Sequence, residues 1–177
     1  MPNWCIGDMK IRGRASDICK FLEENLVTGV SYGKEAKRVI ENDLENGYFS
    51  ASCDNGFMLK GFQRHLVDTN CIEFYFEHLD DGEDKEFFNK QATFSLGLEI
   101  AWGVLPAQDQ MFGEINGGIT RWIEVSKEYD LDLKFYGFEC GYQFNQSIEI
   151  SKGELIKFKD ITFEDYQWEC VLPNLGG

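Results

Sequence analysis

The sequence predicts an α+β fold, a sandwich in which two main helices lie on one face of an antiparallel sheet. Two observations lead to this prediction. A strand followed by a helix occurs twice, over residues 4–28 and 92–128, and further strands follow each unit. Hydrophobic residues make up 43% of the 177-residue chain and aromatic residues 15%, which supplies enough apolar side chain for a packed interior.

The central stretch, residues 92–144, carries the clearest pattern and reads strand, helix, strand. The first strand alternates, with one face made of Phe94, Leu96, Leu98, Ile100 and Trp102. The helix has an apolar stripe at helical spacing, made of Met111, Ile115, Ile119, Trp122 and Ser126, with Asp109 as its N-cap. The returning strand places Leu131, Leu133, Phe135 and Gly137 on one face and Tyr136 and Phe138 on the other.

The N-terminal unit repeats this plan on a smaller scale. Residues 4–12 form a strand that ends at Gly13, and Ser16 is the expected N-cap of the helix that follows. The buried stripe of that helix is Ile18, Phe21, Leu22 and Leu26. Two such units together are typical of a ferredoxin-like sandwich.

The middle of the chain is expected to be an insertion, at about residues 30–90, within one domain that spans residues 1–177. Residues 30–46 suggest a second short helix, with Ala36, Val39, Ile40 and Leu44 on one side. Strands 48–53 and 57–64 flank an Asp-Asn-Gly sequence that favours a hairpin turn. A strand over 71–78 leads into an acidic, solvated connection at 79–90.

The C-terminal region is expected to add strands at a sheet edge. Residues 143–150 continue the sheet, Lys152-Gly153 is a turn, and residues 154–159 and 163–171 read as short strands. The final residues, 173–177, are expected to fray.

Charge and hydropathy restrict the classes of partner. The formal net charge is −14, which repels phosphate backbones, so direct nucleic-acid binding is not expected. No apolar run reaches the roughly 18 residues that a membrane helix needs. The first ten residues do not resemble a secretory signal, so we expect a cytoplasmic protein without membrane partners.

Motifs for catalysis or metal binding are missing from the sequence. The six cysteines, at 5, 19, 53, 71, 140 and 170, include no CxxC pair, and we expect them to be reduced and mostly buried. Neither histidine lies near a cysteine pair, so no metal site is predicted. Phosphate-loop, dinucleotide, zinc-protease and esterase motifs are absent, so no cofactor is predicted and the sequence does not identify an enzyme.

The start of the chain resembles a known family. Met-Pro-Asn-Trp-Cys at residues 1–5, followed by a short strand, Gly13 and a helix, is similar to the YubB/Api92-like ferredoxin-like family of uncharacterised phage and plasmid proteins. The second half is also similar, in Ala101-Trp102, Pro106, Tyr129-Asp130 and the Glu139-x-Gly141 sequence before Phe144. The resemblance implies a ferredoxin-like fold and an accessory protein of a bacterial mobile element or its host. It implies no established activity.

One polar and aromatic cluster is the candidate ligand or partner surface, made of Trp4, Glu99, Trp102, Glu139 and Tyr142. Glu99 and Glu139 lie on strands that could belong to one sheet, where paired carboxylates can do acid–base chemistry or bind a cation. The ordinary alternative is that such residues line the sheet or pack in the core.

Three functions follow from these observations. The first is a protein-interaction module that uses exposed sheet edges to bind a protein partner or a second copy. The second is an acidic mimic of nucleic acid that blocks a DNA-binding enzyme, with carboxylates at residues 80–86 and 160–169. The third is a small-ligand binder or enzyme that uses Glu99 and Glu139.

Overall fold

The computed structural model describes residues 4–29, 36–43, 46–62, 64–75, 89–101, 103 and 118–169. These residues form eleven strands and three helices, and the strands make an eight-stranded and a three-stranded antiparallel sheet. The described part of the chain is therefore mostly β and contains a second sheet, so the predicted ferredoxin-like α+β sandwich is wrong.

The elements in chain order are β1 (Trp4–Arg14), α1 (Ala15–Asn25), β2 (Leu26–Thr28), β3 (Arg38–Asp43), β4 (Tyr48–Cys53), β5 (Phe57–Leu59), β6 (His65–Val67), β7 (Cys71–Tyr75), β8 (Gln91–Ala101), α3 (Gly118–Glu128), β9 (Asp132–Glu139), β10 (Phe144–Ser151), β11 (Glu154–Thr162) and α4 (Tyr166–Glu169).

The large sheet has the strand order β11-β10-β9-β1-β8-β6-β5-β2. Its centre is β1, which pairs with β8 from Trp4 opposite Ala101 to Arg14 opposite Gln91, and with β9 on its other side. The strand–helix–strand reading of residues 92–144 is confirmed in its described part by β8, α3 and β9, while Asp109, Met111 and Ile115 lie outside the described residues. The two strands are not neighbours, however, because β1 lies between them.

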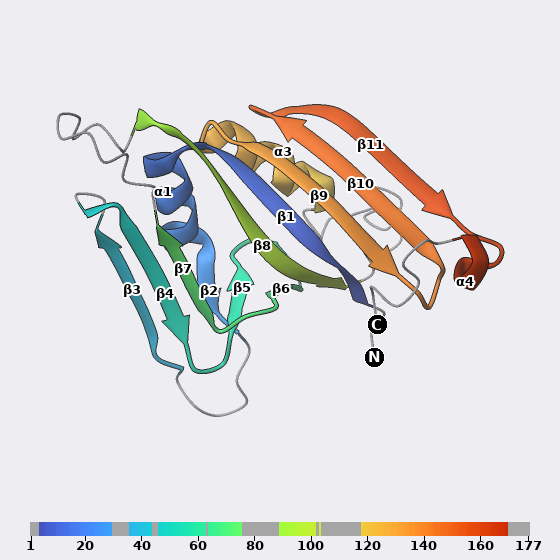
Figure 1. Cartoon of the computed structure of the whole chain (residues 1–177), viewed down its shortest axis with the longest axis horizontal. Coiled ribbons are helices and arrows are strands. Elements are labelled where there is room, and N and C mark those ends of the chain that lie inside the picture. Colours follow the sequence, from blue (N-terminus) through green and yellow to red (C-terminus); the bar gives the residue numbers. More distant parts are fainter. Residues whose placement is uncertain are drawn as a thin grey trace.

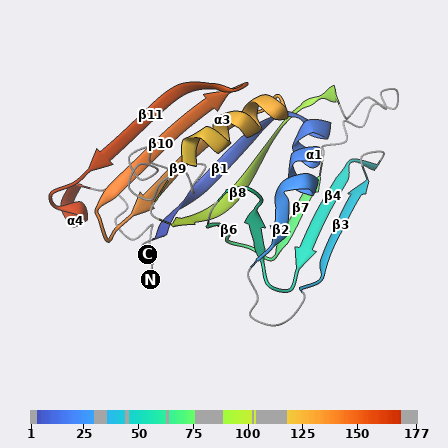
Figure 2. The same ribbon diagram turned by 180° about the vertical axis from the view of Figure 1, so that it is seen from behind.

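Both longer helices lie on one face of the large sheet, and the other face is turned toward the viewer in Figure 1. Figure 2 shows α1 and α3 in front of the sheet, with the three-stranded sheet β3-β4-β7 beside α1. The middle of the chain explains why the predicted fold fails. Its strands β2, β5 and β6 extend one edge of the large sheet, whereas β3, β4 and β7 form a second sheet.

The predicted helix over residues 30–46 is also wrong within its described part, because Arg38–Asp43 is the strand β3. β3 pairs residue by residue with β4, from Arg38 opposite Cys53 to Asp43 opposite Tyr48. Between them, Asn46 donates its backbone N–H to the Asp43 carboxylate over 3.1 Å. These pairings fix the backbone of a polar segment whose local sequence favours a helix weakly.

The Asp-Asn-Gly turn forms, but the predicted hairpin around it does not. Gly56 has φ +71° and donates its N–H to the carbonyl of Cys53 over 3.2 Å, as a tight turn requires. The strands on either side then separate: β4 pairs with β3 and β7, and β5 pairs with β2 and β6.

Two element ends differ from the prediction. The first helix begins at Ala15 and has no side-chain N-cap, so Ser16 is not its cap; the N–H of Ala15 bonds the carbonyl of Lys90 instead. Residues 163–171 do not form a strand in their described part, since Tyr166–Glu169 is the short helix α4. The Lys152-Gly153 turn is confirmed, with φ of +50° and +85°, and joins β10 to β11.

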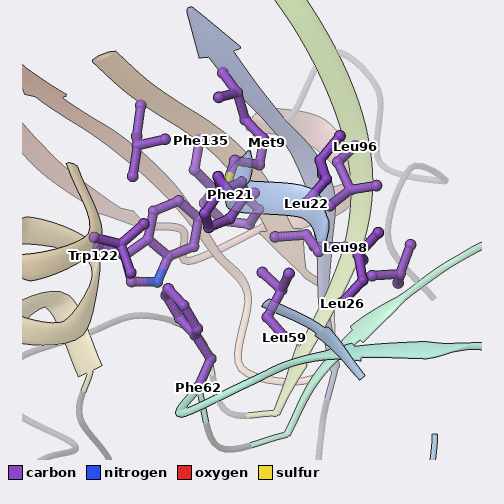
Figure 3. Close-up of a cluster of buried hydrophobic side chains, with 14 of the residues drawn as sticks. Met9, Phe21, Leu22, Leu26, Leu59, Phe62, Leu96, Leu98, Trp122 and Phe135 are labelled. Carbon is purple, nitrogen blue, oxygen red and sulfur yellow. The ribbon is translucent and has the colours of Figure 1, made fainter. Parts of the chain in front are cut away.

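The core lies between the large sheet and the two helices (Figure 3). The predicted stripe of the first helix is confirmed, since Ile18, Phe21 and Leu22 of α1 are fully buried, and so is Leu26, which begins β2. Trp122 of α3 is also fully buried and packs on Phe135 of β9, with ring centroids 5.7 Å apart. Sequence periodicity therefore identifies the buried faces of both helices and of the central strands.

Candidate interaction surface

The face of the large sheet that α1 and α3 leave uncovered is called the open face below. Directly opposite residues of antiparallel strands share a face, so the registers identify its side chains. They are Trp4, Ile6, Asp8, Lys10 and Arg12 of β1, Glu99 of β8, Asp132, Lys134, Tyr136 and Phe138 of β9, Asn145, Ser147, Glu149 and Ser151 of β10, and Lys157, Lys159 and Ile161 of β11.

Cations gather on this face although the chain is strongly acidic. Arg12 binds Asp132 at 2.7 Å, and Lys134 binds Glu149 at 3.1 Å. Lys10, Lys157 and Lys159 are exposed and form no ion pair within the described ranges. The open face therefore carries five cationic side chains beside the carboxylates of Asp8, Glu99, Asp132 and Glu149, in a chain of net charge −14.

The ion pair between Arg12 of β1 and Asp132 of β9 is well anchored. Asp132 accepts hydrogen bonds from the Ser151 hydroxyl at 2.6 Å and from the Arg12 guanidinium at 2.7 Å. Burial acts to raise the pKa of Asp132, but the hydrogen bonds from Ser151 and Arg12 and the charge of Arg12 outweigh it, so the pKa of this carboxyl is lowered.

Two hollows lie on the open face. One, of about 430 Å³, is lined by Lys10, Arg12, Asp132, Lys134, Glu149 and Ile156, among others. The other, of about 400 Å³, is lined mainly by Asp8, Lys10, Asp68, Tyr136 and Phe138. Each combines carboxylates with ammonium groups, so both offer hydrogen-bond partners to a charged side chain, and Ile6, Tyr136 and Phe138 make much of the second hollow apolar.

The outer strand β11 borders the open face and forms one edge of the large sheet (Figure 1). Eight of its nine residues are exposed, and the remaining one, Ile161, is half-buried. Three of the exposed residues are apolar: Leu155 is 44% exposed, Ile156 56% and Phe158 37%. Long, exposed edge strands with apolar side chains are uncommon in proteins because they attract other strands.

The backbone of β11 presents free groups at regular positions. Phe163 donates its N–H to the carbonyl of Gln143 over 2.9 Å, so the backbone groups of Phe163 point toward the side of β10. Backbone direction alternates along a strand, so Thr162, Asp160 and Phe158 direct their N–H and C=O groups away from β10. Within the described ranges β11 pairs with β10 alone, and these groups are therefore available to an added strand.

The residues predicted as a candidate surface do not form a single site. Trp4 is half-buried and lies on the open face with Glu99, and Tyr142 is 63% exposed in the turn between β9 and β10. Trp102 lies outside the described residues. Glu139 is 2% exposed and lies on the opposite face, which packs against the helices.

Glu139 has a structural position in the β9–β10 turn. Its carboxylate accepts the backbone N–H of Gly141 over 2.9 Å and the backbone N–H of Tyr142. The adjacent Cys5 thiol is buried, and burial, followed by the charges of Glu139 and Asp160, raises its pKa to about 12. Because Glu99 and Glu139 lie on opposite faces, the sheet separates the predicted carboxylate pair.

The acidic residues proposed as a nucleic-acid mimic fall in two places. Residues 80–86 lie outside the described residues. In the second group, Glu169 accepts the backbone N–H groups of Glu164 and Asp165 at 3.0 and 2.8 Å, so its carboxylate closes the loop before α4. Loss of hydration raises the pKa of Asp160, whose side chain lies on the helix-bearing face.

Sequence reasoning placed the C-terminal strands at a sheet edge, and β11 forms one edge of the large sheet, but the residues predicted as a candidate surface include none of its residues. The available signal was the alternation of apolar residues with Lys157 and Lys159, because lysine on an exposed strand is a common feature of sheet edges. Which strand lies at an edge depends on the strand order, which local sequence does not encode.

The described ranges contain no group of three or more histidine, cysteine, aspartate or glutamate side chains placed to hold a metal ion. Among the helices described, none is both long and apolar enough to span a bilayer.

Comparison of the chain with protein-family models, curated proteins and solved structures found no match. The resemblance carried by residues 1–5 therefore stays a prediction.

Proposed function

We propose that this chain is a protein-interaction module that accepts an extended segment of a partner protein as an additional strand beside β11. The observation that carries the proposal is the combination of an exposed nine-residue edge strand with outward-pointing backbone groups at Phe158, Asp160 and Thr162. An accessory role of this kind in a mobile element or its host agrees with the resemblance noted for residues 1–5.

Strand addition supplies affinity and specificity from different groups. The partner backbone pairs with the outward N–H and C=O groups of β11, and its side chains meet those of β11 on alternating faces. The apolar side chains of Leu155 and Phe158 gain burial in such a complex, at roughly 25 cal/mol for each Å² of apolar surface removed from water. Costs of ordering the partner reduce this gain.

A proline on β11 tests the proposal. Proline removes one backbone N–H and is tolerated on an edge strand where that N–H points outward. Asp160→Pro therefore removes an N–H needed by a partner and keeps the pairing with β10. Asp160→Ala is the matched control, since it removes the same carboxylate and keeps the N–H.

The measurement is capture of partners from a lysate of the source cells by each tagged variant, with circular dichroism to confirm folding. We expect proteins held by the wild type and by Asp160→Ala to be lost from Asp160→Pro. Equal capture by all three chains, or capture of nothing by any of them, contradicts strand addition.

A further inference from the structure

We propose that the strand accepted by β11 is acidic, with glutamate or aspartate alternating with apolar residues. This inference rests on the proposed function and names the chemistry of its partner. It starts from the two lysines of β11, Lys157 and Lys159, which both lie on the open face.

Neither ammonium group forms an ion pair within the described ranges. Lys159 lies opposite Ser147 in the register, and Lys157 lies opposite Glu149. The Glu149 carboxylate, however, binds Lys134 at 3.1 Å. A strand added outside β11 would place side chains directly beside Lys157 and Lys159, where opposite charges stabilise a sheet and like charges destabilise it.

The other face of β11 requires a different kind of residue. Phe158 is 37% exposed and Leu155 44% exposed, and both lie on the helix-bearing face, opposite Ile148 and Ile150. Apolar side chains of an added strand would cover them. A register shift between Glu149 and Ile150 lets Phe158 and Leu155 share this face, and over Lys157–Lys159 the side chains alternate regularly. The best partner therefore places acidic residues beside the two lysines and an apolar residue between them.

A second copy of the same strand fits poorly in the registers centred on residues 157–160, because these place like charges opposite each other. When two antiparallel copies of β11 are related by a two-fold axis, the axis passes between one residue and the same residue of the other copy. Centring on Lys157, Lys159 or Asp160 places that charged residue opposite itself, and centring on Phe158 places Lys157 opposite Lys159. The charges on this edge therefore disfavour pairing with itself and favour an acidic strand.

The test uses two nine-residue peptides with blocked ends, one alternating valine with glutamate and one alternating valine with lysine, labelled for fluorescence anisotropy. We expect the full chain to bind the glutamate peptide about tenfold or more tightly than the lysine peptide at low salt, as two opposed charge pairs allow. Added salt should reduce this preference.

Charge reversal gives the sharper experiment. In Lys157→Glu/Lys159→Glu the preference should invert, so that the lysine peptide binds more tightly. The matched control is Lys37→Glu/Lys60→Glu, which changes the net charge by the same amount at exposed positions outside β11. This control should keep the preference of the wild type.

Each contradictory outcome has a distinct meaning. If both peptides bind equally and Asp160→Pro abolishes both, strand addition stands and the acidic partner is wrong. If the glutamate peptide still binds Asp160→Pro, the attraction is electrostatic only, and strand addition also fails. Binding of neither peptide, or a wild-type dimer that Asp160→Pro converts to a monomer in sedimentation, overturns the acidic strand as the occupant.

Discussion

Trp122 donates its indole N–H to Nε2 of His65 over 3.2 Å, inside the contact between α3 and β6. Trp122 is fully buried and His65 is 4% exposed. The ring of Phe62 packs against both, with centroids 5.9 Å from Trp122 and 5.2 Å from His65. One hydrogen bond therefore connects the helix to a short strand near the edge of the large sheet.

Replacing Trp122 by phenylalanine tests how much this hydrogen bond contributes to the stability of the fold. Trp122→Phe keeps an aromatic ring and removes the N–H, so we expect the free energy of unfolding to fall by about 1–3 kcal/mol. The measurement is urea denaturation followed by circular dichroism. Trp168→Phe is the control, since Trp168 is 85% exposed and should change stability by less than about 0.5 kcal/mol. Equal effects of the two substitutions contradict the prediction.

Two glycines in the large sheet differ in what surrounds them. A Cβ on Gly7 would lie 2.1 Å from the backbone carbonyl oxygen of Tyr136, and a Cβ on Gly97 would lie 2.0 Å from Oδ2 of Asp68. The backbone of β9 cannot move away without disturbing the ladder, whereas the exposed side chain of Asp68 can rotate.

The alanine substitutions should therefore have unequal costs. We expect Gly7→Ala to lower the free energy of unfolding by about 1–3 kcal/mol or more, and Gly97→Ala by less than about 1 kcal/mol. Thermal and urea denaturation of the two single variants measure the difference. A Gly97→Ala variant as unstable as Gly7→Ala would show that Asp68 is held rigidly against the sheet.

The parts of the fold that depend on local periodicity could be predicted from the sequence. Leu96, Leu98 and Ile100 alternate with less buried residues on β8, and Ile119 and Trp122 lie at helical spacing on α3, so their buried faces could be identified. A residue pattern of this kind reports on burial because the same spacing recurs within one element.

The parts that depend on pairing between distant segments could not be predicted. Arg38–Asp43 is a strand because β4 pairs with it, and the Asp-Asn-Gly turn leads into two different sheets. The positions of Glu99 and Glu139 on opposite faces follow from the register of β1 between β8 and β9. Contacts between distant segments fix these features, and local sequence contains little information about them.

The cysteines should differ strongly in reactivity. Burial, and then the charge of Glu23, raises the pKa of Cys19 to about 12, and Cys5 has a similar value. At pH 8 only about one in ten thousand of such thiols is ionised. Among the five cysteines in the described residues, Cys71 is the exposed one, on β7, so we expect iodoacetamide to modify it before the other four.

Mass spectrometry of peptides after timed alkylation measures these rates. Cys5 and Cys19 should react only after urea unfolds the chain, and Cys71→Ser should remove the fast phase. Modification of Cys5 in the native chain at a rate near that of Cys71 would contradict the burial of β1 in the sheet.

The last prediction concerns pH and the ion pair on the open face. The pKa of Asp132 is lowered in the folded chain, because hydrogen bonds from Ser151 and Arg12 outweigh the effect of burial. A lowered carboxyl pKa stabilises the folded state above the unfolded pKa, near 3.8, and this stability is lost as pH falls through the folded value. Asp132→Asn should therefore lower the free energy of unfolding at pH 7, by about 0.5–2 kcal/mol given its partial exposure.

The pH dependence separates this charge effect from a loss of packing. The difference in the free energy of unfolding between wild type and Asp132→Asn should stay constant from pH 7 to about 5 and shrink below the unfolded pKa of the carboxyl. Urea denaturation at pH 7, 5, 3 and 2.5 follows it. Asp8→Asn is the control, because Asp8 is exposed on the same face. If the difference in the free energy of unfolding stays constant down to pH 2.5, the cost of Asp132→Asn is a loss of packing. The ionised carboxylate would then contribute nothing to the stability of the sheet.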